Sequence, residues 1–248
     1  MKTPRPFRMK RFVIEQSHAS MKVGTDSDLL GTMAYGGDRI LDIGTGTGVL
    51  ALMMAQRYPE SQLMAIEIDA GAIIDATTNF AASPWAARLS LRHTSLQDYV
   101  EQCSDRYDAI VCNPPYFDKS LECPDPGRRQ ARHTSSLPFD QLIDGVGRLL
   151  SPYGYFSVIL PPEVKDSFCL LCAQASLTLT RCHNIHTMPD RDVKRHVLIF
   201  QKIQTSSLSQ TCTQTHFMYA SDGSITPWYR ELIKDFLIGI PTIMQKKF

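Results

Sequence analysis

Residues 39–48 read Arg-Ile-Leu-Asp-Ile-Gly-Thr-Gly-Thr-Gly, and this stretch decides the fold of the chain. An apolar run typical of a buried strand ends in a turn with a glycine at every second position, and residues 49–57 continue in a helical pattern. Glycines let a backbone pass close to a ligand, and the first N–H groups of a helix point at it. The stretch predicts a strand, a ligand-binding turn and a helix, the repeating unit of an α/β protein with a mostly parallel sheet.

The spacing of the glycines distinguishes between classes of ligand. Gly44, Gly46 and Gly48 form G-x-G-x-G, which is neither the P-loop pattern nor the G-x-G-x-x-G of dinucleotide-binding proteins. Asp42 directly precedes the turn, where a carboxylate would repel a pyrophosphate but would pair with the ammonium of an amino-acid group. S-adenosylmethionine carries that ammonium and no phosphate, so it is the cofactor that the sequence predicts.

A second candidate ligand group lies at the end of the next predicted strand, residues 63–69. Glu67 stands about 20 residues beyond the turn, where a carboxylate accepts hydrogen bonds from both hydroxyls of a ribose. Asp69 has a different predicted role, because the alanine-rich helical pattern of residues 70–82 begins directly after it. We expect Asp69 to be the N-cap of that helix and Glu67 to bind the ribose.

The segment Asn113-Pro-Pro-Tyr116 ends a further predicted strand, residues 107–112. Prolines cannot donate to a ladder and fix their φ, so the chain leaves the sheet on a rigid path with free carbonyl groups. An exocyclic amino group could share its two N–H bonds between the Asn113 side-chain oxygen and the Pro114 carbonyl, while Tyr116 stacks on its ring. A proline-terminated strand with a solvated asparagine and a surface tyrosine remains the alternative.

Composition narrows the class of protein further. A chain of 248 residues is long enough for one α/β domain with a buried core, and 26 basic against 25 acidic residues create no global field for nucleic acid. The seven cysteines fit reduced thiols in the cytosol, and the Cys169/Cys172 pair has no second pair at zinc spacing, so no metal is expected. No apolar stretch is long enough for a membrane span and no secretory signal is found, so the protein is expected in the cytoplasm.

Basic residues nevertheless gather locally. Residues 1–12 are predicted to be a flexible basic arm before a single domain over residues 13–248. Two predicted loops also carry arginine and lysine side chains that would hold a phosphate backbone. They contribute Arg128, Arg129 and Arg132 from the loop over 117–138, and Lys194 and Arg195 from the connection of a C-terminal hairpin. For each basic residue alone, a solvated surface charge remains the alternative.

Taken together, these motifs resemble the class I S-adenosylmethionine-dependent methyltransferases that modify exocyclic amines. Residues 20–34, Ser-Met-Lys-Val-Gly-Thr-Asp-Ser-Asp-Leu-Leu-Gly-Thr-Met-Ala, narrow the resemblance to the bacterial tRNA1(Val) (adenine-37-N6)-methyltransferases. Residues 83–86, 129–132 and 227–237 are similar to that family as well. The resemblance implies a Rossmann-like α/β fold with a seven-stranded, mostly parallel sheet, an antiparallel C-terminal hairpin and helices on both faces.

The resemblance also implies roles for single residues. Asn113, Pro114 and Tyr116 would bind the amine and stack on the base, with Phe117 beside them, and residues 13–37 would cover the cofactor or the substrate. Contacts with the cofactor are implied for Lys22, Thr25, Asp42, Gly44, Gly46, Gly48 and Glu67. These enzymes usually have an acid after the third strand for the adenine of the cofactor, and this chain has Ser95, whose hydroxyl would accept that bond without a charge.

The predicted reaction transfers a methyl group from S-adenosylmethionine to the exocyclic N6 of adenosine 37, 3′ to the anticodon of tRNA1(Val). Two alternatives with the same chemistry stay open. One is a protein-glutamine N5-methyltransferase, which would need no basic rim, and the other is adenine-N6 methylation of a different RNA or of DNA. A degenerate fold that only binds a partner is disfavoured, because the turn glycines, Asp42, Glu67, Asn113 and Tyr116 are all present.

Overall fold

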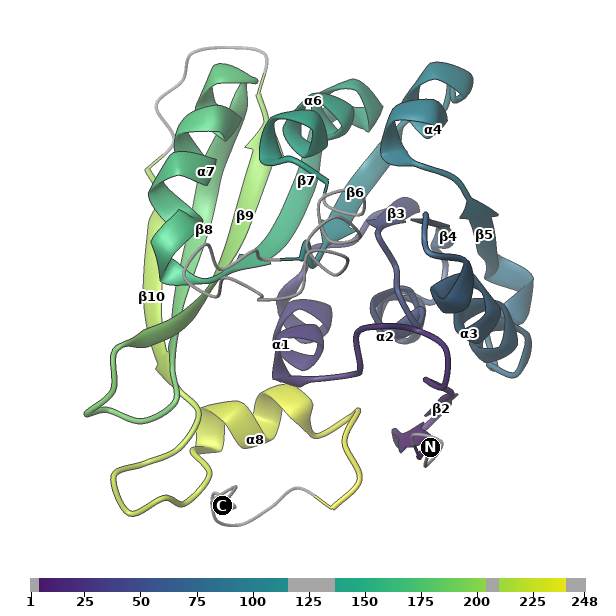
Figure 1. Ribbon diagram of the computed structural model, residues 1–248. Coiled ribbons are helices and arrows are strands. Elements are labelled where there is room, and N and C mark those ends of the chain that lie inside the picture. The colour runs from purple at the N-terminus through teal and green to yellow at the C-terminus, as the bar shows by residue number, and fades with distance from the viewer. Residues whose placement is uncertain (1–4, 116–136, 204–209, 240–248) are drawn as a thin grey trace, which may run out of the picture.

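A central mixed sheet organises the molecule, for which we obtained a computed structural model (Figure 1). The structure describes residues 5–115, 137–203 and 210–239. The sheet has eight strands in the order β10-β8-β9-β7-β6-β3-β4-β5, and a separate antiparallel pair, β1-β2, precedes it. The strands are β1 (Phe7–Arg8), β2 (Val13–Ile14), β3 (Arg39–Ile43), β4 (Gln62–Glu67), β5 (Leu89–His93), β6 (Tyr107–Cys112), β7 (Leu150–Leu160), β8 (Leu177–His186), β9 (Val193–Lys202) and β10 (Cys212–Phe217).

Helices cover both faces of this sheet, as Figure 1 shows. One face carries α1 (Thr25–Met33), α2 (Val49–Arg57), α3 (Ala70–Ala81) and α8 (Pro227–Ile233). The other carries α4 (Leu96–Gln102), α6 (Phe139–Leu149) and α7 (Pro162–Gln174). The predicted class, a Rossmann-like α/β fold with a mostly parallel sheet, is therefore confirmed. No helix in the described ranges is long and apolar enough to cross a membrane.

Strand β3 shows why the sequence folds in this way. Successive side chains of a strand point to opposite faces, so Ile40 packs into the core beneath α1 and α2 while Leu41 packs into the core beneath α4 and α6. Both side chains are fully buried. A strand covered on both sides reads as a continuous apolar run, which is how residues 39–43 appear in the sequence.

The sheet has eight strands where seven were predicted, and the additional strand lies in its C-terminal part. The predicted hairpin is present, since β8 and β9 pair antiparallel and β9 also pairs antiparallel with β7. Strand β10 then pairs with β8 in parallel and forms the edge of the sheet. The sequence did not indicate β10 because Cys212–Thr215 are exposed and mostly polar, so the segment has no apolar alternation.

The N-terminal segment is also more ordered than predicted. Within the expected flexible arm, Phe7 and Arg8 pair with β2, and the Met9 side chain is buried. Met9 forms a bridge with Leu237, and the Lys10 N–H donates to the carbonyl of Phe236 at 2.8 Å. The expectation of a flexible arm is therefore wrong for residues 7–12, because the backbone of Met9 and Lys10 pairs with the segment that follows α8 and Phe12 packs against Trp85.

Helix α1 contains a buried carboxyl group, that of Asp28, whose charged form is disfavoured by burial in the core. Asp28 is only 6% exposed, and no described residue forms a hydrogen bond with its Oδ1 atom. Burial raises the pKa of Asp28 from 3.8 to about 7. A carboxyl group with a raised folded-state pKa binds more protons in the folded than in the unfolded chain between these two values. The contribution of Asp28 to stability therefore falls as the pH rises from about 4 to about 7.

Replacing Asp28 with asparagine should remove this pH dependence, because an amide has no charge to desolvate. At pH 8 we expect Asp28→Asn to be more stable than the wild type by about 1–3 kcal/mol, with little or no advantage at pH 4. Thermal unfolding at both pH values measures the difference. The exposed Asp144→Asn is the control, and an Asp28→Asn advantage that does not grow with pH would contradict the prediction.

Candidate active site

The glycine turn joins β3 to α2 at the carboxyl edge of the sheet. Gly44 and Gly46 have φ values of +68° and +57°, a backbone region that disfavours residues with a Cβ atom. A Cβ built at either position would meet no other atom within 4 Å, so the surface of the turn is open there. The predicted ligand-binding turn has the conformation and the open space that a close backbone–ligand approach requires.

Asp42 supports this turn from beneath. Its side chain is 1% exposed, and its Oδ2 atom accepts hydrogen bonds from the Thr45 hydroxyl at 2.6 Å and from the Ala51 N–H at 3.1 Å. Burial raises the pKa of Asp42 from 3.8 to about 7, and these two hydrogen bonds offset only part of that effect. The Oδ1 atom is buried and has no hydrogen-bond partner in the described residues. Such an orphaned acceptor fits the cationic group of an amino-acid ligand above the turn.

Glu67 holds the turn from the side of β4. Its Oε2 atom accepts from the Gly46 N–H, and its Oε1 atom accepts from the N–H groups of Ile68 and Asp69, all at 2.8 Å. A carboxylate has about four acceptor positions, so roughly one remains for a ribose hydroxyl. Glu67 thus has a structural role in addition to the predicted one. Asp69 is the predicted N-cap of α3, confirmed by the hydrogen bond that its Oδ1 atom accepts from the Ala72 N–H at 2.7 Å.

Asn113 lies next to the glycine turn although the two are far apart in the sequence. Cys112 and Ile43 are paired residues of the parallel strands β6 and β3, so Asn113 and Gly44 follow at adjacent positions of the same edge. Neighbouring strands are about 5 Å apart. Asn113 is half-buried and Pro114 is buried. Five other predicted site residues lie outside the described residues, namely Tyr116, Phe117, Arg128, Arg129 and Arg132.

Two residues of the N-terminal segment, Lys22 and Thr25, were predicted to contact the cofactor, and they lie in different local structures. Lys22 is exposed, and its ammonium donates to the carbonyls of Gln16 and Ala19 at 2.6 Å each, so it closes a loop of its own segment. Thr25 is the first residue of α1. The N-cap of α1 is Gly24, and no side chain forms a cap hydrogen bond there.

Ser95 has a structural role that the sequence analysis did not assign. It is the N-cap of α4, where its hydroxyl oxygen accepts from the Asp98 N–H at 3.0 Å. The same hydroxyl donates to the Asp98 carboxylate at 2.6 Å. Ser95 therefore has one acceptor position left for a ligand, and it lies at the end of β5 where the resemblance places it.

Lys194 and Arg195, the two predicted cations of the hairpin, differ in exposure and in ion pairing. Lys194 is exposed. Arg195 is half-buried, and its Nε atom donates to the Asp26 carboxylate at 2.8 Å. Arg195 thus links β9 to α1, and part of its charge is neutralised within the protein.

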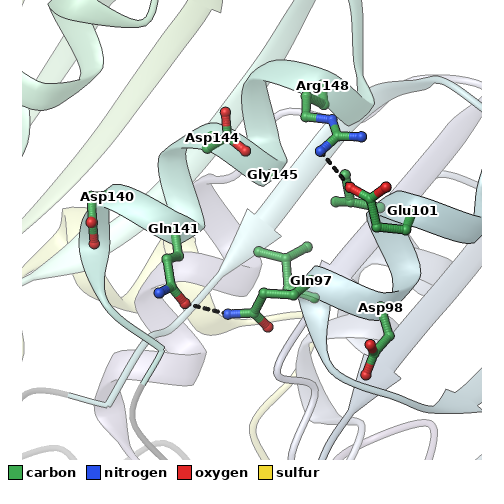
Figure 2. A pocket seen from close by; sticks show the side chains of 10 residues that line it. Gln97, Asp98, Glu101, Asp140, Gln141, Asp144, Gly145 and Arg148 are labelled. Atoms are coloured by element: carbon green, nitrogen blue, oxygen red, sulfur yellow. Dashed lines mark hydrogen bonds and ion pairs between the residues drawn. The ribbon is translucent and has the colours of Figure 1, made fainter.

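A pocket of about 490 Å³ lies between α4 and α6, on the face of the sheet opposite α2 (Figure 2). Gln97 donates to Gln141 across it, and Arg148 forms an ion pair with Glu101 at 2.8 Å. The remaining polar lining is acidic, and no predicted site residue contributes to it. Arg148 is the one cation among the described residues that line the pocket, and it is already paired with a carboxylate, so this lining offers no free cation for a phosphate backbone.

Two buried polar residues of α3 were not predicted from the sequence; both bind the N-terminal segment, and one of them also binds the glycine turn. Asp75 and Asn79 are each 2% exposed and bind backbone groups of residues 15–19. Their positions, four residues apart in an alanine-rich helix, were the available signal, because such a pair lies on one helical face. The residues described here contain no group of three or more side chains that could hold a metal ion.

Comparison with known proteins defines the class. Residues 16–125 match the methyltransferase small domain family. A structure described as a predicted O-methyltransferase from Agrobacterium tumefaciens superimposes with a TM-score of 0.65 and 18% identity, covering 85% of this chain and 96% of that one. A methyltransferase from Pyrococcus furiosus gives a TM-score of 0.55 and 18% identity, over 77% and 89% of the two chains. The fold is therefore that of known methyltransferases, and the matched domain contains the glycine turn.

Relatives with higher identity define the family. A tRNA1(Val) (adenine(37)-N6)-methyltransferase from Phocaeicola vulgatus is 45% identical over 202 residues, which are 80% of this chain and 85% of that protein. The enzyme of the same name from Flavobacterium psychrophilum is 37% identical over 236 residues, or 94% and 99% of the two chains. The chain belongs to the family of tRNA1(Val) (adenine(37)-N6)-methyltransferases.

Replacing Glu67 with alanine should weaken the binding of S-adenosylhomocysteine by about 2–4 kcal/mol, because it removes a charged acceptor and releases the Gly46 N–H. Titration calorimetry measures the affinity. Asp69→Ala is the matched control, since it should lower the stability of α3 by about 1 kcal/mol with a much smaller effect on affinity. An unchanged affinity in Glu67→Ala would move the ribose contact elsewhere, most simply to Asp69.

Proposed function

We propose that this chain transfers a methyl group from S-adenosylmethionine to the exocyclic N6 of adenosine 37 in tRNA1(Val). The observation that carries the proposal is the adjacency of the glycine turn and Asn113 at one edge of the sheet. A methyl donor on the turn and an amine on Asn113 would meet there. Membership of the family supports this substrate. The reaction is placed in the cytoplasm, because that is where its tRNA substrate is found.

The proposed chemistry depends on orientation. The lone pair of an aromatic amine is delocalised into its ring, so the amine is a poor nucleophile. Hydrogen bonds from its two N–H groups to the Asn113 side chain and the Pro114 carbonyl would turn the lone pair out of conjugation and towards the methyl group. The buried, rigid proline fixes the second acceptor. Tyr116, with Phe117, is proposed to stack on the base after it leaves its own stack.

S-adenosylmethionine supplies a methyl group on a positively charged sulfur. In the proposal Gly44, Gly46 and Gly48 let its amino-acid end approach the backbone, with Asp42 beneath and Glu67 at its ribose. The open space above the first two glycines and the orphaned Oδ1 atom of Asp42 support this arrangement. Lys22, Thr25 and Ser95 are proposed as further contacts at its two ends.

The tRNA backbone is proposed to bind cations around this edge. Lys194 is exposed and extends from the start of β9, which pairs with the carboxyl end of β7. Arg195 contributes less in this proposal because Asp26 already pairs with it. Arg128, Arg129 and Arg132 belong to the same proposal through their positions between Tyr116 and α6 in the sequence.

A protein-glutamine N5-methyltransferase would use the same edge geometry, because a side-chain amide also offers two N–H bonds. Such an enzyme would have no need for the cations around the site. Incubating the protein with labelled S-adenosylmethionine and either bulk tRNA or a protein extract separates the two functions. Labelling of adenine N6 in tRNA supports the proposal, and labelling of protein alone overturns it.

Asn113→Ala should lower the rate of methyl transfer by at least ~10²-fold, because it removes an acceptor whose bond to the amine strengthens as positive charge develops there. The tRNA affinity should barely change, since phosphate contacts dominate it. Single-turnover methylation of a tRNA1(Val) transcript measures the rate, and mass spectrometry identifies the product nucleoside. Asn113→Asp, which keeps an acceptor but adds a charge, is the second variant. A fully active Asn113→Ala enzyme would contradict the role of this residue.

Lys194→Ala should weaken tRNA binding and reduce the slope of log K against log salt by about 1, because one phosphate contact is lost. Arg195→Ala should have a smaller effect, since its charge is partly neutralised by Asp26. Filter binding at several salt concentrations measures both slopes. Arg106→Ala is the control, because the exposed Arg106 precedes β6 and lies at the opposite edge of the sheet. An unchanged slope in Lys194→Ala would make Lys194 a solvated surface charge.

A further inference from the structure

Two buried polar side chains on α3 have no part in the proposed transfer step. Asp75 and Asn79 stand four residues apart, so they lie one above the other on the same face of the helix. Each is 2% exposed. Burying a polar group costs free energy unless it is hydrogen-bonded, so the partners of these side chains indicate what they do. Within the described residues, the partners of both side chains lie in the N-terminal segment or in the glycine turn.

Asp75 binds three donors of two successive residues. Its Oδ2 atom accepts from the backbone N–H groups of His18 at 2.9 Å and Ala19 at 2.7 Å. Its Oδ1 atom lies 2.8 Å from the Nδ1 atom of the His18 ring. Burial by itself would raise the pKa of Asp75, but the hydrogen bonds from Ala19 and His18 outweigh it and lower the pKa. The carboxylate is thus well solvated by the protein, and the segment around His18 is fixed to α3.

Asn79 connects the same segment to the glycine turn. Its Oδ1 atom accepts from the Glu15 N–H at 2.7 Å, and its Nδ2 atom donates to the Glu15 carbonyl at 2.9 Å. The second N–H of the amide donates to the carbonyl of Thr47 at 2.8 Å. Thr47 stands between Gly46 and Gly48. The Asn79 side chain therefore binds two backbone segments, which lie 32 and 64 residues before it in the sequence.

Residues 15–22 form a compact piece that Asn79 joins to the glycine turn. Lys22 closes it internally by donating to Gln16 and Ala19. It also lies directly on the first turn of α3, because a Cβ built at Gly71 would come within 2.9 Å of the His18 carbonyl oxygen. The chain continues from this segment into α1, so its position also sets where α1 begins.

We propose that Asp75 and Asn79 are positioning residues for the cofactor pocket, which hold residues 15–22 in place as the wall of the pocket beside Thr47. The proposal rests on the proposed cofactor, S-adenosylmethionine, and is independent of the nucleic-acid substrate. Neither side chain touches reacting atoms. Their removal therefore changes the affinity for the cofactor and leaves the rate at saturating cofactor nearly unchanged, because that rate depends on the arrangement around Asn113.

The first experiment compares two replacements of Asp75 by calorimetry with S-adenosylhomocysteine. Asp75→Ala leaves the N–H groups of His18 and Ala19 without their acceptor, so the dissociation constant should rise at least tenfold. Asp75→Asn can keep the geometry, because its oxygen accepts from the two backbone groups and its NH2 donates to a neutral His18 ring. Asp75→Asn should bind within about threefold of the wild type, since all three hydrogen bonds remain.

The second experiment replaces Asn79 and a neighbouring control residue. Asn79→Ala should also weaken binding at least tenfold, because both the Glu15 and the Thr47 contacts are lost. Thr78→Ala is the matched control on the same helix, because Thr78 is exposed and its hydroxyl donates to the Ile74 carbonyl of α3 itself. Binding is measured below the unfolding temperature of each variant, so that a loss of overall stability does not change the affinity.

Hydrogen–deuterium exchange of the wild-type protein provides a readout that needs no variant. Addition of S-adenosylhomocysteine should slow exchange in residues 15–22 more than in the turn over 220–224. Asp75→Ala and Asn79→Ala proteins that fold and bind with wild-type affinity would overturn the proposal, as would a wild-type segment that the ligand does not protect. A wild-type protein that binds no S-adenosylhomocysteine would overturn the proposed cofactor as well, whereas a failure of tRNA methylation alone would leave this inference standing.

Discussion

The parallel pairing of β3 with β4 and β6 is the constraint on which the site depends. In parallel strands the carboxyl ends meet at one edge, so the residues that follow Ile43, Ile66 and Cys112 come together. These are the glycine turn, Glu67 and Asn113, which are separated by long stretches of sequence. A register shift of one residue would move each side chain to the opposite face of the sheet, where it would meet a core packed around other side chains. The burial of the strands on both faces therefore also fixes the geometry of the site.

The glycine turn needs support from outside because its glycines have no side chains. Three buried side chains provide it from three elements: Asp42 in β3 binds Thr45 and Ala51, Glu67 in β4 binds the Gly46 N–H, and Asn79 in α3 binds the Thr47 carbonyl. A turn held in this way presents its backbone to a ligand in a fixed conformation. Ligand binding then does not have to order the turn, because the turn is already ordered when the protein has folded.

The two ends of the described chain also meet on the face of the sheet that carries α1, α2, α3 and α8. The strand pair β1-β2 and the segment after α8 contact each other through the Met9–Leu237 bridge. Phe12 packs its ring edge against Trp85 at 5.5 Å, which joins the N-terminal pair to the region after α3. Helix α1 lies inside this closure and is linked to β9 by the Asp26–Arg195 ion pair. This face of the sheet is thus covered by segments from both ends of the described chain.

The sequence by itself determined the α/β class, the strand-turn-helix unit at residues 39–57 and the cap at Asp69, because each depends on local periodicity, glycine spacing or helix-end chemistry. The apolar pattern likewise predicted the β8–β9 hairpin.

Only the tertiary structure decided the partners of the polar side chains: that Arg195 pairs with Asp26, that Ser95 caps α4, and that Asp75 and Asn79 hold residues 15–19. It also decided that β10 joins the sheet and that residues 7–12 pack on the C-terminal segment. These contacts join residues distant in the chain, and a polar side chain carries no local signal of which distant backbone group will satisfy it once both are buried.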